Sequence, residues 1–65
     1  MIRTYEHKGY TLSWANDGIR DIGGYSIVKG VNIYELGTTT AEPITEEQAR
    51  MMIERVDART EGNNG

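Results

Sequence analysis

The chain has 65 residues, a net charge of −3 and no cysteine. A domain of this length buries only a small core, and without cysteine neither a disulfide nor a thiolate metal site can stabilise it. A single histidine also excludes a multi-histidine zinc site within one chain. We therefore expect helix-to-sheet packing to hold the fold, with no metal ion and no cofactor.

Acidic residues are concentrated toward the C-terminus. Residues 1–30 carry four basic and three acidic side chains, whereas residues 42–65 carry six acidic and three basic ones. This balance argues against a nucleic-acid partner, because such binding needs clustered Lys and Arg side chains. No apolar run approaches the roughly 20 residues of a membrane helix, and no signal-peptide core is present. We expect a soluble cytoplasmic protein that does not contact a membrane.

Residues 2–7 and 10–14 are predicted to form a β-hairpin. Lys8 and Gly9 suit a two-residue turn, because glycine readily adopts the positive φ that such turns require. The resulting register opposes His7 with Tyr10, Tyr5 with Leu12 and Arg3 with Trp14. These six side chains then share one face of the hairpin, and the smaller polar ones share the other.

Two further strands are predicted at residues 25–28 and 31–36, which are rich in β-branched and aromatic residues. Asp17-Gly18 indicates a turn after the first hairpin, and Gly23-Gly24 is expected to break the chain before the third strand. Residues 19–22 between them are too short and too mixed to indicate more than a possible strand.

Two arrangements remain open at Lys29-Gly30. A turn there would pair Val28 with Val31 and Tyr25 with Tyr34. The likeness of this segment to the one that begins at Lys8 favours the turn. A strand that continues through the segment would instead make Gly30 a bulge or a point of close backbone approach.

A helix is predicted from Thr45 to about residue 60. Its apolar residues recur at i, i+3, i+4 and i+7 and therefore share one face: Ala49, Met52, Ile53 and Val56. Thr45 and Gln48 have the spacing of a capping box, and Pro43 disfavours an earlier start. Gly62 suits a left-handed C-cap, so residues 62–65 are expected to form a flexible tail.

Together these elements predict an α+β fold in a single domain over residues 1–61. A small antiparallel sheet of three to four strands in a meander precedes one C-terminal helix, which packs on one face of the sheet. This order is common in small bacterial and phage proteins, but a fold alone does not determine a function.

No residue pattern indicates catalysis. No motif places a Ser or Cys nucleophile near His7, which would need such partners to act as a general base. Glu46, Glu47 and Glu54 are typical of a solvated helix face, with Glu46 spaced for an ordinary ion pair with Arg50. We therefore expect a protein that is not an enzyme and has no catalytic, cofactor-binding or metal-binding residues.

Exposed apolar and aromatic residues indicate binding instead. Met51 lies opposite the apolar seam of the predicted helix, beside Arg55 and Ala58, and Met and Arg are enriched at interfaces. Tyr25 and Tyr34 complete the predicted partner interface. The sequence predicts a small non-enzymatic protein-binding or regulatory module that binds a protein partner or pairs with itself as a homodimer.

Two alternative functions follow from other features. The acidic C-terminal third would suit an inhibitor or decoy that occupies the nucleic-acid site of a partner protein. The aromatic residues of the sheet could instead stack the bases of a single-stranded nucleic acid, although the acidic charge balance opposes this second alternative.

Overall fold

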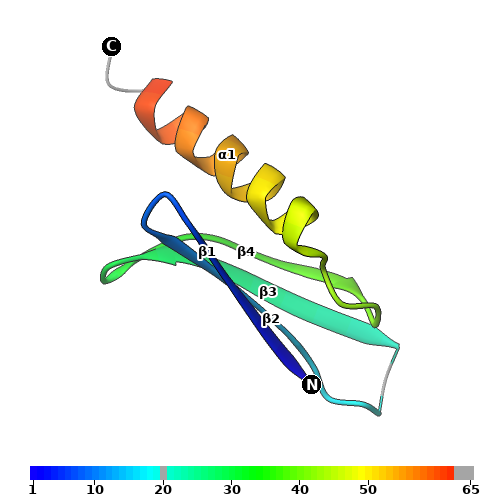
Figure 1. The fold of residues 1–65 in the computed structure, drawn as a ribbon. Coiled ribbons are helices and arrows are strands. Elements are labelled where there is room, and N and C mark those ends of the chain that lie inside the picture. Colours follow the sequence, from blue (N-terminus) through cyan, green and yellow to red (C-terminus); the bar gives the residue numbers. More distant parts are fainter. Residues whose placement is uncertain (20, 63–65) are drawn as a thin grey trace.

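The computed structural model describes residues 1–19 and 21–62. In this part of the chain four strands precede one helix: β1 (Ile2–His7), β2 (Tyr10–Asn16), β3 (Ile22–Lys29), β4 (Asn32–Thr40) and α1 (Glu46–Gly62). The strands form an antiparallel sheet in the order β1-β2-β3-β4, and α1 crosses one face of it (Figure 1). The predicted α+β fold, a meander followed by one C-terminal helix on one face of the sheet, is confirmed.

The first hairpin has the predicted register, including His7 opposite Tyr10. Lys8 and Gly9 form its turn with φ values of 53° and 81°, as a type I′ turn requires. β2 continues two residues beyond the predicted end to Asn16. It does so because the last residues of β2 also pair with β3.

The third strand begins earlier than predicted and runs through Gly23 and Gly24, so the predicted chain break there is wrong. The reason is a close approach between neighbouring strands: a Cβ on Gly23 would lie 2.6 Å from the Thr40 carbonyl oxygen and 2.7 Å from Trp14 Nε1. Glycine therefore serves here to make room beside the Trp14 indole. Within residues 19–22 only Ile22 joins a strand, and Arg20 lies outside the described residues.

The second hairpin turns at Gly30 and Val31, which confirms the turn interpretation over a continuous strand. Lys29 pairs with Asn32, so the turn lies one residue later than predicted and the expected pairing of Val28 with Val31 is wrong. Gly30 has a φ of 62° and takes the first central position, where a type II′ turn requires glycine. The resemblance to the first hairpin correctly indicated a turn but placed it one residue too early, because the two turns are of different types.

A β-bulge in β4 changes which side chains face the helix. Ile33 and Glu35 oppose consecutive residues of β3, which leaves Tyr34 as the extra residue. The expected pairing of Tyr34 with Tyr25 is therefore wrong, because Tyr25 lies opposite Gly37. Bulges redirect side chains, and this one allows both Tyr34 and Glu35 to face the helix side of the sheet.

The start of α1 is set by the predicted capping box. The Thr45 hydroxyl oxygen accepts from the Gln48 backbone N–H at 3.1 Å, and the Gln48 side-chain oxygen accepts from the Thr45 N–H at 3.0 Å. Backbone helix continues to Gly62, slightly beyond the predicted end. Residues 63–65 of the predicted tail lie outside the described residues.

The hydrophobic core lies between α1 and the sheet. Its members are at most 7% exposed: Tyr10, Leu12, Trp14, Ile27, Ile44, Ala49, Ile53 and Val56. Three of the four predicted seam residues belong to it, and Met52 is half-buried at its margin. Sequence reasoning misses Ile44, because this residue precedes the helix in a connection of polar residues. The Tyr5 hydroxyl donates to the Ile44 carbonyl oxygen at 2.5 Å and so ties that connection to β1.

We predict that Ile53→Asp unfolds the protein. The substitution removes an apolar side chain worth about 1.5–3 kcal/mol and places a carboxylate in a site that is 0% exposed. A core of this size rarely contributes more than about 3–5 kcal/mol, so the loss exceeds the margin of stability. Circular dichroism and thermal melting measure the effect. Met51→Asp is the matched control, because Met51 is 60% exposed and should tolerate the same change.

Candidate protein-binding surface

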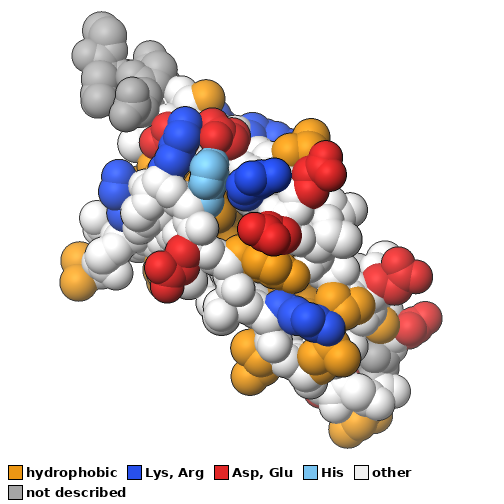
Figure 2. Space-filling view, viewed as in Figure 1, with side chains coloured by type: hydrophobic (Ala, Val, Ile, Leu, Met, Phe, Trp, Pro, Cys, Tyr) orange, Lys and Arg blue, Asp and Glu red, His pale blue; other side chains and the backbone are white. Residues whose placement is uncertain are grey.

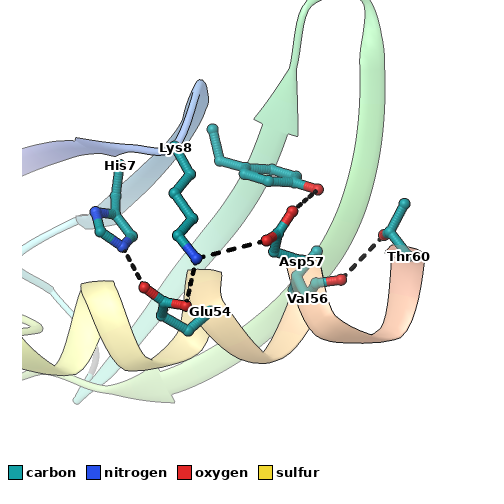
Figure 3. Close-up of polar contacts among 7 residues, drawn as sticks. His7, Lys8, Glu54, Val56, Asp57 and Thr60 are labelled. Atoms are coloured by element: carbon teal, nitrogen blue, oxygen red, sulfur yellow. Dashed lines mark hydrogen bonds and ion pairs between the residues drawn. The ribbon is translucent and has the colours of Figure 1, made fainter. Parts of the chain in front are cut away.

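On the β1–β2 side, α1 is joined to the hairpin turn by ion pairs and hydrogen bonds (Figure 3). Lys8 Nζ lies 2.8 Å from Glu54 Oε1 and 3.7 Å from Asp57 Oδ2, and His7 Nε2 lies 2.7 Å from Glu54 Oε2. The Tyr10 hydroxyl donates to Asp57 Oδ1 at 3.3 Å. We call these five residues the hairpin–helix network; it joins the turn of the first hairpin to α1.

Electrostatics in this network favour the charged forms of Glu54 and Lys8. The hydrogen bond from Lys8, followed by the contact with His7, lowers the pKa of Glu54 from its ordinary value of 4.5. The hydrogen bond to Glu54 and its negative charge raise the pKa of Lys8 from 10.5. Figure 2 shows charged side chains of both signs and histidine crowded where the hairpin turn meets the helix. The ion pair expected between Glu46 and Arg50 does not form among the described side chains.

On the β4 side, α1 is held by a shorter chain of contacts. The Tyr25 hydroxyl donates to Glu35 Oε2 at 2.5 Å, and Arg59 donates to Glu35 Oε1 at 2.5 Å. The hydrogen bond from Tyr25, with a smaller contribution from Arg59, lowers the pKa of Glu35. The Tyr25 ring occupies the space above Gly37, where an added Cβ would approach it to 2.5 Å. The bulge in β4 and this glycine together position the contact.

A groove lies between α1 and the connection that leads into it from β4. It has a volume of about 390 Å³ and is lined by Thr39, Thr40, Glu42, Pro43, Ile44, Gln48, Met51, Met52 and Arg55. The groove exists because α1 packs mainly on β1 and β2, while the helix-facing positions of this part of β4 hold only Gly37 and Thr39. Buried Ile44 and half-buried Met52 make its lining largely apolar.

Met51 and Arg55 also line a second, shallower depression on the outer surface of α1. Its other lining residues are His7, Glu47, Arg50, Glu54 and Ala58. Met51 and Arg55 therefore stand between the two depressions, and Ala58 continues their line along the helix. We call these three exposed residues the α1 ridge. Among the described side chains, no carboxylate forms an ion pair with Arg55.

The predicted interface residues do not form one continuous surface. The structure brings Met51, Arg55 and Ala58 together on the α1 ridge, whereas Tyr25 and Tyr34 line neither depression. Tyr25 is half-buried beneath the helix side chains. Tyr34 packs edge-on against Tyr10, with ring centroids 5.4 Å apart. Sequence reasoning missed Met52 as a groove residue because its place in the apolar seam indicated core alone, and it assigned no role to Ile44.

The aromatic residues of the sheet lie on the helix-facing side. Trp14 and Tyr10 are 0% and 1% exposed, and Tyr5 and Tyr25 pack against the core. The Trp14 indole N–H donates to Thr39 Oγ1 at 2.8 Å and is thereby satisfied in the interior. The described part of the sheet therefore presents no open row of aromatic rings on which bases could stack.

No protein-family model matches this chain, and no curated protein or solved structure is significantly similar to it. Within residues 1–19 and 21–62, no helix has the length and apolar character needed to cross a membrane. The same residues contain no group of three or more His, Cys, Asp and Glu side chains that could hold a metal ion.

We predict that the Glu54→Gln variant loses less stability than the wild type when the pH is lowered. Because the pKa of Glu54 is lowered in the folded state, its contribution is complete above about pH 4.5 and disappears as the pH falls below that value. When the pH is lowered from about 6 to about 3, the melting temperature of the wild type should decrease, and that of the variant should decrease less.

Glu42→Gln serves as the control, because the Glu42 carboxylate contacts no basic group among the described side chains. It should retain the pH dependence of the wild type. Identical acid profiles for wild type and Glu54→Gln would contradict a stabilising role for the network.

Proposed function

We propose that this protein is a small non-enzymatic module that binds a protein partner through the α1 ridge and the groove beside it. The observation that carries the proposal is the position of Met51 and Arg55, which stand exposed on the rim of an apolar groove. Methionine adapts its shape to different partners, and both residue types are enriched at interfaces. Neither residue belongs to the hydrophobic core, and Arg55 forms no ion pair among the described side chains.

The chemistry of the groove defines the partner segment that would fit it. Met52 and Ile44 offer an apolar lining for one or two side chains of a docked segment. The Arg55 guanidinium can bind a carboxylate in a bidentate manner, and it has no such partner among the described side chains. We therefore propose a segment that carries a bulky apolar side chain close to an Asp or Glu residue.

The environment of His7 supports a non-enzymatic role. His7 is the residue best suited to act as a general base, and its Nε2 lies 2.7 Å from the Glu54 carboxylate. The same carboxylate is bound to Lys8, so these groups link the hairpin to the helix. A structural role accounts for each of these contacts.

The two alternative functions receive less support from the side-chain positions. Base stacking would need open aromatic rings, and Trp14 and Tyr10 are covered by α1. A nucleic-acid decoy would need a free row of carboxylates along the helix, and Lys8 occupies both Glu54 and Asp57. Docking on the α1 ridge remains the function that the arrangement of these residues favours.

A random peptide library displayed on phage, selected against the immobilised protein, tests this proposal. Selected peptides should carry an apolar residue next to an acidic one and should bind in isothermal titration calorimetry. Met51→Glu and Arg55→Glu should each weaken binding by roughly tenfold or more, because they introduce a charge or reverse one at the contact.

Arg3→Glu is the matched control, since it makes the same charge reversal at an exposed position on β1, outside the groove. It should leave peptide affinity unchanged, with circular dichroism confirming the fold of all variants. Selected peptides that bind Arg55→Glu as tightly as wild type would exclude the proposed surface.

A further inference from the structure

The face of the sheet that points away from α1 forms a second exposed surface, which we call the open face. Strand alternation and the observed register assign it these residues: Ile2, Thr4, Glu6, Thr11, Ser13, Ala15, Ile22, Gly24, Ser26, Val28, Ile33, Leu36, Thr38 and Thr40. The described part of the chain contains one helix, and that helix lies on the other side of the sheet (Figure 1). No element of the described chain covers the open face.

The composition of this face is unusual for an exposed surface. Ile2, Ile22, Ile33 and Leu36 are 73%, 51%, 64% and 69% exposed. Among the described residues of this face Glu6 is the one charged side chain, although the chain carries 17 Lys, Arg, Asp and Glu residues. A surface that combines exposed aliphatic side chains with almost no charge is typical of an interface.

The larger side chains on the open face lie around its margin. β4 carries Ile33 and Leu36, and β1 at the opposite edge carries Ile2 and Glu6. β2 carries small side chains on this face, among them Ser13 and Ala15. A two-fold axis parallel to the strands would place β4 of one copy over β1 of the other, with Leu36 opposite Thr4 and Ile33 opposite Glu6.

We propose that two copies of this chain pack open face to open face, with the helix of each copy on the outside. The packing of two sheets about 10 Å apart, with aligned strands, is the usual geometry of such a sandwich. Because the chain has a net charge of −3, copies of it repel one another, but this face is almost neutral. A second copy can therefore approach here without juxtaposing like charges.

The area of the face fits a dimer of moderate affinity. Four strands about 4.8 Å apart, each contributing about seven residues at about 3.3 Å, give a flat footprint of about 450 Å². Because side chains protrude from the sheet, the accessible area of the face is larger than this flat footprint. The total area that two copies bury therefore approaches the roughly 1,200 Å² at the lower limit of stable interfaces. Weak and transient complexes have interfaces at this lower limit, so we expect self-association at micromolar concentrations.

This inference is independent of the proposed protein-binding function. The groove and the α1 ridge lie on the helix side of the sheet, and the dimer contact lies on the opposite side. A dimer would display two α1 ridges pointing outward. Either proposal can fail while the other holds, because peptide binding and self-association are measured separately.

Sedimentation velocity over a concentration series from about 1 to about 200 μM tests the dimer, since the expected dissociation constant lies within this range. Wild-type protein should shift from monomer to dimer as concentration rises. Leu36→Lys and Ser13→Lys should each weaken self-association by roughly tenfold or more, because both place a charge in the contact. Leu36 is 69% exposed, so its replacement should leave the fold intact, as circular dichroism will verify.

Val31→Lys is the matched control: Val31 is 96% exposed and lies in the β3–β4 turn, outside the open face. This variant should dimerise like the wild type. A wild type that stays monomeric throughout, or a control as defective as Leu36→Lys, would overturn the proposal. A loss of dimer in Leu36→Lys but not in Ser13→Lys would also overturn it, since that result indicates pairing of β4 edges instead of face packing.

Discussion

A single helix is narrower than a four-stranded sheet, and this difference in width determines which parts of the sheet stay uncovered. An α-helix with its side chains is about 10–12 Å across, whereas four strands span about 19 Å. α1 therefore packs mainly on β1 and β2 and leaves part of the same face uncovered. Side-chain contacts compensate on both flanks: Lys8 reaches Glu54 on one side, and Glu35 reaches Arg59 on the other.

The surfaces available for binding are consequences of the same difference in width. Where α1 does not reach β4, a groove opens between the helix and its preceding connection, and Met51 and Arg55 stand on its rim. The opposite side of the sheet has no covering element in the described chain and keeps Ile33 and Leu36 exposed. The two proposed contacts thus follow from an apolar surface that a chain of this length cannot bury by itself.

Much of the architecture could be predicted from local patterns. The Lys8-Gly9 turn set the register of the first hairpin, and the Thr45–Gln48 capping box marked the start of the helix. Errors occurred at the Gly23-Gly24 segment, at the second turn and at the bulge in β4. Gly23 was predicted to end a strand but instead makes room for the Trp14 indole, and no local pattern reveals which neighbour a glycine must accommodate.

Periodicity and capping in the sequence were sufficient for the element types, the core face of α1 and the exposure of Met51, because they act over a few adjacent residues. The position of the bulge at Tyr34, the burial of Ile44 and the pairing of His7 with Glu54 depended on strand neighbours and on the crossing angle of the helix. Such contacts join residues far apart in the chain, so they are defined only when the sheet and helix have packed together.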